Sequence, residues 1–167
     1  MNESPEAPDP ERMLLAARTD YVDGFERLLD LAARELRIFD PDLSELRMND
    51  LARIETLTRF LRGSRTRRIY IALHDIEHVS KRCPRLITLL GSYTGSMSIY
   101  QTHGEAAKVQ DCFVLADDRH LVRRPVTSQP RGVLVLNDPK ECQPMRERFE
   151  EIWESSMPGV SANTTGL

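Results

Sequence analysis

Residues 110–124 read Gln-Asp-Cys-Phe-Val-Leu-Ala-Asp-Asp-Arg-His-Leu-Val-Arg-Arg, and they carry the most information about the architecture. Two short apolar runs, Cys112–Ala116 and His120–Arg123, flank the pair Asp117-Asp118. Aspartates between two such runs favour a tight turn that joins neighbouring strands. This stretch therefore predicts a β-hairpin.

The segments on either side of the hairpin predict further strands. Arg68–His74 and Gly132–Leu136 are continuous apolar runs, which are typical of interior strands covered on both faces. Leu36–Phe39 and Ser96–Tyr100 alternate between side-chain types and predict two shorter strands.

Four other segments repeat apolar residues at helical spacing. They begin at Asp20 (with Thr19 or Asp20 as the cap), near Leu51 (ending at Gly63), at Pro84 and at Asp138. The last is the clearest, because Asp138 can cap it and Pro139 suits the first helical position. Asp75–Cys83 has no clear pattern. Helices that alternate with strands predict an α/β fold, a mixed β-sheet flanked by helices on both faces.

Length and composition favour one globular domain. The chain has 167 residues, enough for a sizeable core. The acidic, proline-rich residues 1–18 predict a flexible tail. The domain then spans 19–157, and 158–167 form a second tail. The net charge is −3 at pH 7, and four acids of the first tail account for it, so the body is near neutral. A near-neutral body shows no global charge signal for nucleic acid or membranes.

Several functional classes are disfavoured. The three cysteines are an odd number without a close pair, so we expect reduced thiols, no metal site and no cofactor. No apolar run approaches the roughly 20 residues of a membrane helix. The first residues lack the basic start and apolar stretch of a secretion signal, which makes the cytoplasm the expected location.

The order of elements resembles one half of a phospholipase D-like fold, over roughly Asp20–Ser156. The segment Gln110–Asp117 with its turn is similar to the hairpin that carries His-x-Lys-x4-Asp in that superfamily. The closing helix, which ends Arg148-Phe-Glu-Glu-Ile-Trp153, is also similar. The chain is more similar still to uncharacterised short bacterial domains with a degenerate hairpin, which are sometimes fused to acetyltransferases.

The resemblance fails at the residues that perform the reaction. Asp117 matches the family aspartate, but Gln110 stands at the position of the nucleophilic histidine and Cys112 at that of the phosphate-binding lysine. A glutamine amide neither attacks phosphorus nor transfers a proton near neutral pH, and a thiol supplies no fixed positive charge. A working site in this superfamily also needs two halves, so the resemblance implies a homodimer. We leave catalytic activity open and favour its absence.

Other polar residues are candidates for ligand binding. His74 ends a predicted strand, where α/β sheets often bind ligands. With His78 on one helix it could instead hold zinc, but a strand end and a polar loop are the simpler interpretation. His103 and Lys108 lie in the loop before the hairpin, and a solvated loop is the simpler interpretation there.

Arginines form two groups in the sequence, one before the first continuous apolar strand and one around the hairpin. The members are Arg62, Arg65, Arg67 and Arg68, and then Arg119, Arg123, Arg124 and Arg131. Guanidinium groups suit phosphate, so the two groups would make one nucleic-acid patch if the fold joined them. No aromatic residues alternate with them, as single-strand binding would require.

The first hypothesis is a catalytically degenerate phospholipase D-like domain that serves as a binding or assembly module in the bacterial cytoplasm. It would self-associate, bind a protein partner or a phosphate-containing ligand, and keep a pocket around Gln110, Cys112 and Asp117. The alternative is a nucleic-acid or phosphate-ligand binder that uses the arginine groups. A third hypothesis is a residual phosphodiesterase, active as a homodimer, with His103 in place of the lost histidine.

Overall fold

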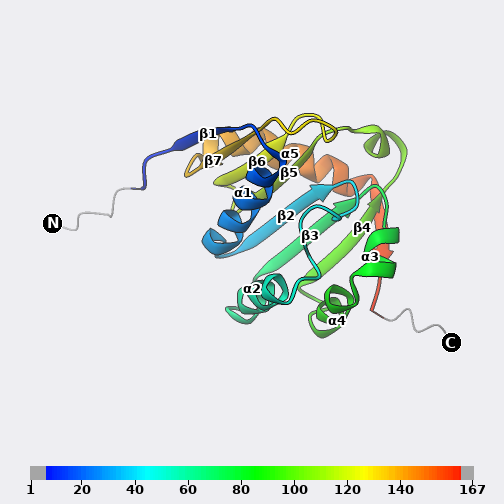
Figure 1. Cartoon of the computed structure of the whole chain (residues 1–167). Coiled ribbons are helices and arrows are strands. Elements are labelled where there is room, and N and C mark those ends of the chain that lie inside the picture. Colours follow the sequence, from blue (N-terminus) through cyan, green and yellow to red (C-terminus); the bar gives the residue numbers. More distant parts are fainter. Residues whose placement is uncertain (1–6, 163–167) are drawn as a thin grey trace.

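One mixed sheet of eight strands organises the computed structural model, which describes residues 7–162 (Figure 1). The strand order is β1-β7-β6-β5-β2-β3-β4-β8. The strands are β1 (Glu11–Leu15), β2 (Glu35–Asp40), β3 (Arg68–Leu73), β4 (Met97–Thr102), β5 (Cys112–Ala116), β6 (His120–Arg124), β7 (Gly132–Leu136) and β8 (Ser156–Val160). The helices are α1 (Arg18–Leu31), α2 (Leu51–Arg62), α3 (Glu77–Arg82), α4 (Pro84–Ser92), the short 3-10 helix η1 (Gly104–Lys108) and α5 (Pro139–Glu154).

The direction of the strands defines two edges of the sheet. Strands β2, β3 and β4 are parallel, whereas β5 runs antiparallel to β2 and pairs with β6 in the predicted hairpin. The carboxyl ends of β2–β4 therefore lie beside the start of β5 and the end of β6. We call this end of the strands the carboxyl edge, which is distinct from the outermost strands β1 and β8. The opposite edge, the amino edge, holds the starts of β2 and β3 and the β5–β6 turn.

Helices cover both faces of the sheet, as the sequence predicts. Helices α1, α2 and α4 pack on one face and α5 on the other (Figure 1). The larger core lies under the three helices and the smaller one under α5. Gly24 lets α1 approach β6 closely, because a Cβ atom there would stand 3.0 Å from Val122 Cγ2. The mixed sheet with helices on both faces is confirmed.

Helix starts follow local hydrogen bonds. The predicted cap of α5 is confirmed, since Asp138 Oδ1 accepts the backbone N–H of Glu141 at 3.1 Å. The predicted cap of α1 at Thr19 or Asp20 is wrong: the helix begins at Arg18, after Ala17. The Asp20 carboxylate instead accepts the N–H of Ala17 from inside the helix. The segment without a clear pattern, 75–83, contains α3.

Both predicted tails contribute strands. Residues 11–15 form β1, an edge strand that pairs with β7, although residues 1–18 are expected to be flexible. At the other end β8 pairs with β4 and includes Pro158 and Gly159. An edge strand tolerates proline because one side of its backbone has no partner strand. The amino-acid composition of a tail does not reveal such strand pairing, because the pairing uses backbone N–H and C=O groups. Residues 1–6 and 163–167 lie outside the described part.

No helix in the described residues is both long enough and apolar enough to cross a membrane.

Candidate functional site

The three positions that resemble the family motif lie at two different edges of the sheet. Gln110 is exposed just before β5, and Cys112 is buried at the start of β5. Asp117 follows the end of β5 at the amino edge. Asp117 comes five positions after Cys112 along this strand, which corresponds to about 17 Å. The expected pocket around Gln110, Cys112 and Asp117 is therefore not formed.

Asp117 anchors the chain where α1 joins β2. Its two carboxylate oxygens accept the backbone N–H groups of Ala33, Arg34 and Glu35 at 2.7, 2.7 and 3.0 Å. The residue itself has a positive φ of 56° in the hairpin turn, a conformation that aspartate tolerates better than most residues. The side chain is buried, so its structural role accounts for all these contacts.

Cys112 lies in a closed polar cluster on the α1 side of the sheet. The Tyr21 hydroxyl faces its thiol without a well-formed hydrogen bond, and the negative charge of Asp40 acts on it. Burial, reinforced by Asp40, raises the pKa of the Cys112 thiol to about 12. The thiol is thus protonated at neutral pH and is a poor nucleophile.

Arg124 brings a positive charge to this cluster. It stands directly opposite Cys112 in the β5–β6 ladder and is only 2% exposed. Its guanidinium lies 4.6 Å over the ring of Tyr21, and Nη1 donates to Glu45 Oε2 at 2.9 Å. Its Nε and Nη2 atoms are buried and have no hydrogen-bond partner within residues 7–162. A buried guanidinium group thus stands in the neighbouring strand beside Cys112.

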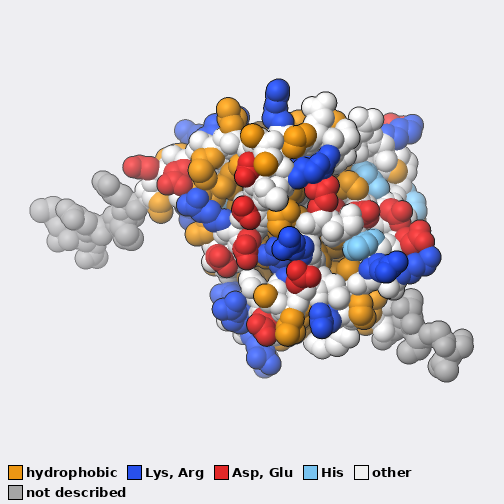
Figure 2. Space-filling view, viewed as in Figure 1, with side chains coloured by type: hydrophobic (Ala, Val, Ile, Leu, Met, Phe, Trp, Pro, Cys, Tyr) orange, Lys and Arg blue, Asp and Glu red, His pale blue; other side chains and the backbone are white. Residues whose placement is uncertain are grey.

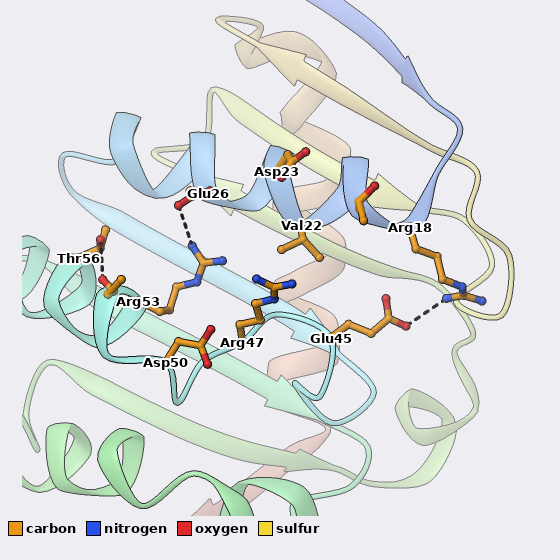
Figure 3. A pocket seen from close by; sticks show the side chains of 11 residues that line it. Arg18, Val22, Asp23, Glu26, Glu45, Arg47, Asp50, Arg53 and Thr56 are labelled. Carbon is orange, nitrogen blue, oxygen red and sulfur yellow. Dashed lines mark hydrogen bonds and ion pairs between the residues drawn. The ribbon is translucent and has the colours of Figure 1, made fainter.

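Glu45 closes the cluster toward solvent. Its second oxygen accepts from Arg18 Nη1 at 3.1 Å (Figure 3). One carboxylate therefore joins an exposed and a buried arginine. The glutamate lies in the β2–α2 loop between Leu43 and Arg47, both with positive φ (68° and 54°). The loop therefore holds Glu45 over Arg124 at some conformational cost.

Asp40 ties this loop to the end of β2. Its Oδ2 accepts the N–H of Leu43 at 2.7 Å and of Asp42 at 3.2 Å. Burial raises the pKa of the Asp40 carboxyl to about 6, and the two backbone hydrogen bonds oppose the rise only in part. The carboxyl thus changes charge close to neutral pH.

Beside this loop a cleft of about 710 Å³ runs between α1 and the segment 45–56 (Figure 3). Glu45 and Arg18 border one part of it. At another, Glu26 lies 3.9 Å from Arg53, which is buried against Phe25. The cleft therefore combines both charge signs.

His74 holds the loop that precedes β5. Its Nδ1 lies 2.6 Å from Thr102 Oγ1 and its Nε2 lies 2.8 Å from the carbonyl oxygen of Val109. A carbonyl only accepts, so Nε2 donates its N–H to Val109, and Nδ1 shares a hydrogen bond with the Thr102 hydroxyl. The edge of its ring meets Phe39, with centroids 5.2 Å apart. These contacts occupy both ring nitrogens.

His103 and Lys108 lie in the exposed segment before β5. Lys108 pairs with Glu105 at 3.1 Å within η1, whereas the backbone N–H of His103 donates to Ser155. Of the four imidazoles, His103 and His78 have no side-chain hydrogen bond among the described residues, and His103 is the one near Gln110 in sequence.

The structure does not join the two arginine groups into one patch. Arg67 and Arg68 lie at the amino edge, where their guanidinium groups donate to the carbonyls of Phe60 and Arg65. Arg123 and Arg124 lie at the carboxyl edge, and Arg123 pairs with the buried Asp111 at 3.2 Å. The hairpin also divides the second arginine group. Its turn lies at the amino edge, whereas the end of β6 lies at the carboxyl edge.

The three cysteines are all buried and unpaired with one another. Burial also raises the pKa of Cys142 to about 12. His120 accepts the N–H of Asn137 through Nδ1, and burial lowers its pKa. Within residues 7–162, no three His, Cys, Asp or Glu residues lie close enough together to hold a metal ion.

Sequence reasoning missed the residues that surround Cys112. Tyr21 fits the apolar stripe of a helix, and Asp40 resembles a simple strand terminus. Glu45 and Arg18 come from a loop and a helix start, with no pattern linking them to β5. One signal was available: Arg124 shares the strand parity of the buried Val122, so an arginine points toward a covered face.

Solved structures with the same architecture have different activities. The archaeal chromatin protein TrmBL2, described as showing a novel mode of DNA binding, matches 93% of this chain at 12% identity and a TM-score of 0.68. This chain spans 56% of that protein. Nuc of Salmonella typhimurium, a phospholipase D family member, is matched over its full length and over 92% of this chain, with 12% identity and a TM-score of 0.56. Phosphatidylserine synthase of Haemophilus influenzae has a TM-score of 0.59 at 12% identity, over 92% of this chain and 40% of that enzyme.

These similarities define the class: the chain has the phospholipase D-like fold. No curated protein matches the sequence. A family model described as a domain of unknown function (DUF7931) matches residues 17–163, so the chain belongs to that family.

Proposed function

We propose that this chain is a catalytically inert domain of phospholipase D-like fold that acts by binding an oxyanion ligand or a partner. The observation that carries the proposal is the state of position 112. A buried thiol of pKa about 12, with Arg124 beside it and Glu45 above it, stands where the resemblance implies a lysine.

Hydrolysis of the superfamily type needs an imidazole that attacks phosphorus and a cation that holds the phosphate. Gln110 cannot provide the first, and both ring nitrogens of His74 are engaged in holding loops together. At pH 7 a thiol of pKa about 12 is thiolate in about one molecule in 100,000. None of these three side chains is therefore an activated nucleophile.

The same edge is suited to binding an anion. Glu45 lies against Arg18 and Arg124 as a ligand carboxylate or phosphate would, and buried Arg124 has two further donors without an acceptor. Charge-assisted hydrogen bonds from two guanidinium groups favour phosphate-like oxygens. We infer that an oxyanion replaces Glu45 at this place, and that the ligand carries a phosphate or a similar group.

Self-association and location are part of the proposal. The resemblance implies a homodimer through the face where active relatives join their halves, and exposed Gln110 and His103 lie near that edge. Three buried, unpaired cysteines suit the reducing conditions of a cytoplasm.

Sedimentation equilibrium of the wild type and of Gln110→Arg tests the dimer. A monomeric wild type would contradict it.

Hydrolysis of a chromogenic phosphodiester at high protein concentration tests the absence of catalysis. We expect no turnover by the wild type above buffer, and none by Gln110→Ala or His103→Ala. Turnover that disappears in either variant would overturn the proposal and support the residual phosphodiesterase.

Binding of orthophosphate, followed by calorimetry, tests the anion site. Glu45→Gln removes the internal competitor and should bind phosphate about tenfold more tightly than the wild type, roughly the effect of 1.4 kcal/mol. Glu26→Gln is the matched control, because Glu26 borders the same cleft beside Arg53. Glu45→Gln combined with Arg124→Met should lose the gain. Equal affinities in the Glu45 and Glu26 variants would refute the anion site.

A further inference from the structure

Six arginines lie at the amino edge, opposite the cluster around Cys112. We call this group the arginine edge; its members are Arg34, Arg59, Arg62, Arg65, Arg67 and Arg68. Hydrogen bonds to backbone carbonyls join its parts: the backbone N–H of Arg68 donates to the carbonyl of Arg34 at 3.1 Å, and the side-chain Nη1 of Arg68 donates to the carbonyl of Arg65 at 2.7 Å. Arg59 and Arg62 lie on the last turn of α2 and line one shallow cleft of about 470 Å³.

No member of the arginine edge forms an ion pair within residues 7–162. Nine other arginines do, each within 4.0 Å of a carboxylate: Arg12, Arg18, Arg27, Arg37, Arg53, Arg123, Arg124, Arg146 and Arg148. The acidic residues that line the clefts beside the arginine edge are Asp30 and Glu55. The Asp117 carboxylate also lies at this edge, but it accepts the backbone N–H of Arg34. The six guanidinium groups thus have no carboxylate within 4.0 Å among the described residues.

Part of the edge is held in place by the fold. Arg67 Nη1 donates to the carbonyl of Phe60 at 2.9 Å, and its guanidinium lies 5.3 Å over the Phe60 ring. Arg34, Arg59, Arg62 and Arg65 are exposed. Figure 2 shows Lys and Arg side chains at the corner of the molecule where α2 ends.

We propose that the arginine edge binds the phosphate backbone of a nucleic-acid duplex without regard to sequence. Guanidinium groups match phosphate oxygens in geometry and charge. Phe60 is buried beneath Arg67, so the edge offers no exposed aromatic ring on which unpaired bases would stack. A duplex presents closely spaced phosphates and hides its bases, which fits such a surface. This inference goes beyond the proposed function, because it concerns the opposite edge of the sheet.

Fluorescence anisotropy with a labelled 20-base-pair DNA duplex tests the proposal over a range of salt concentrations. The wild type should bind, and the logarithm of its association constant should fall with the logarithm of salt with a slope of about −4, as for four to five neutralised phosphates. Arg62→Ala with Arg65→Ala should weaken binding about tenfold or more and make the slope shallower by about 2.

The control variant carries Arg82→Ala and Arg131→Ala, two exposed arginines without ion pairs within the described residues and outside the arginine edge. It loses the same charge and should bind like the wild type. Arg62→Lys with Arg65→Lys should keep the slope. Equal losses in the edge and control variants, no duplex binding at 50 mM salt, or binding to anionic vesicles but not to duplex would overturn the inference.

The same samples, run on a gel after binding, separate the two proposals. Intact duplex in a salt-sensitive complex supports both. Cleaved duplex would overturn the inert site alone, and absent binding with no cleavage would overturn the arginine edge alone.

Discussion

At the scale of single residues, Asp40 couples the stability of the fold to pH. Its folded pKa of about 6 exceeds the ordinary value of 3.8 because the carboxyl is buried. Between these pH values the folded state binds more protons than the unfolded state. The stabilisation is therefore fully present below about pH 4 and is lost as pH rises through 6.

We expect the free energy of unfolding of the wild type to fall by on the order of 2 kcal/mol from pH 4 to pH 7.5 through this group. Asp40→Asn keeps an oxygen for the N–H of Leu43 but cannot ionise, so this fall should disappear. Urea unfolding at several pH values measures it, with Asp23→Asn as an exposed control for the loss of one charge. If the free energy of unfolding falls equally with pH in the wild type and in Asp40→Asn, Asp40 is not the group responsible.

Asp117 is a structural residue, although the resemblance places it in a catalytic motif. Asp117→Ala leaves three backbone N–H groups without their acceptor and should cost about 2–4 kcal/mol of unfolding free energy. Asp117→Asn retains one acceptor oxygen and should cost less. Chemical denaturation compares them. A fully stable Asp117→Ala protein with altered ligand binding would instead place Asp117 in the site.

At the scale of elements, β1 covers an otherwise open side of the sheet. Its residues are mostly exposed, but its backbone pairs along the whole of β7. Without it, the apolar strand β7 would become an unprotected edge.

Deletion of residues 1–16 should therefore lower the free energy of unfolding by about 1–3 kcal/mol, through lost ladder hydrogen bonds, and promote aggregation. Urea midpoints and light scattering test this. Deletion of residues 1–6 removes none of β1 and is the control. Identical behaviour of the two deletions would show that β1 contributes nothing.

Most helices and interior strands could be predicted because their signals are local. Arg68–Leu73 has a continuous apolar run, and Pro139–Glu154 has a cap and a stripe. Strands β1 and β8 could not be predicted in this way. Most residues of β1 are exposed, and β8 has no buried residue and includes Pro158, so the signal for both strands is the free edge of a distant strand.

At the scale of the whole molecule, the two charged regions lie at opposite ends of the same strands. Changes in regions without shared contacts add independently. Glu45→Gln should thus raise phosphate affinity by the same factor in the wild type and in Arg62→Ala/Arg65→Ala, and calorimetry on all four proteins measures this. A changed factor would mean that the regions are coupled.

The sequence by itself determined the α/β class and the hairpin, and it places glutamine at position 110 and cysteine at position 112, because these depend on residue type and local spacing. Only the tertiary structure decided that Arg124 stands beside Cys112 under Glu45, that Asp117 lies at the other edge, and which arginines share a surface. The physical reason is that burial and charge pairing depend on residues brought together across strands and loops. Strand register, loop closure and edge pairing set those contacts, and no local pattern encodes them.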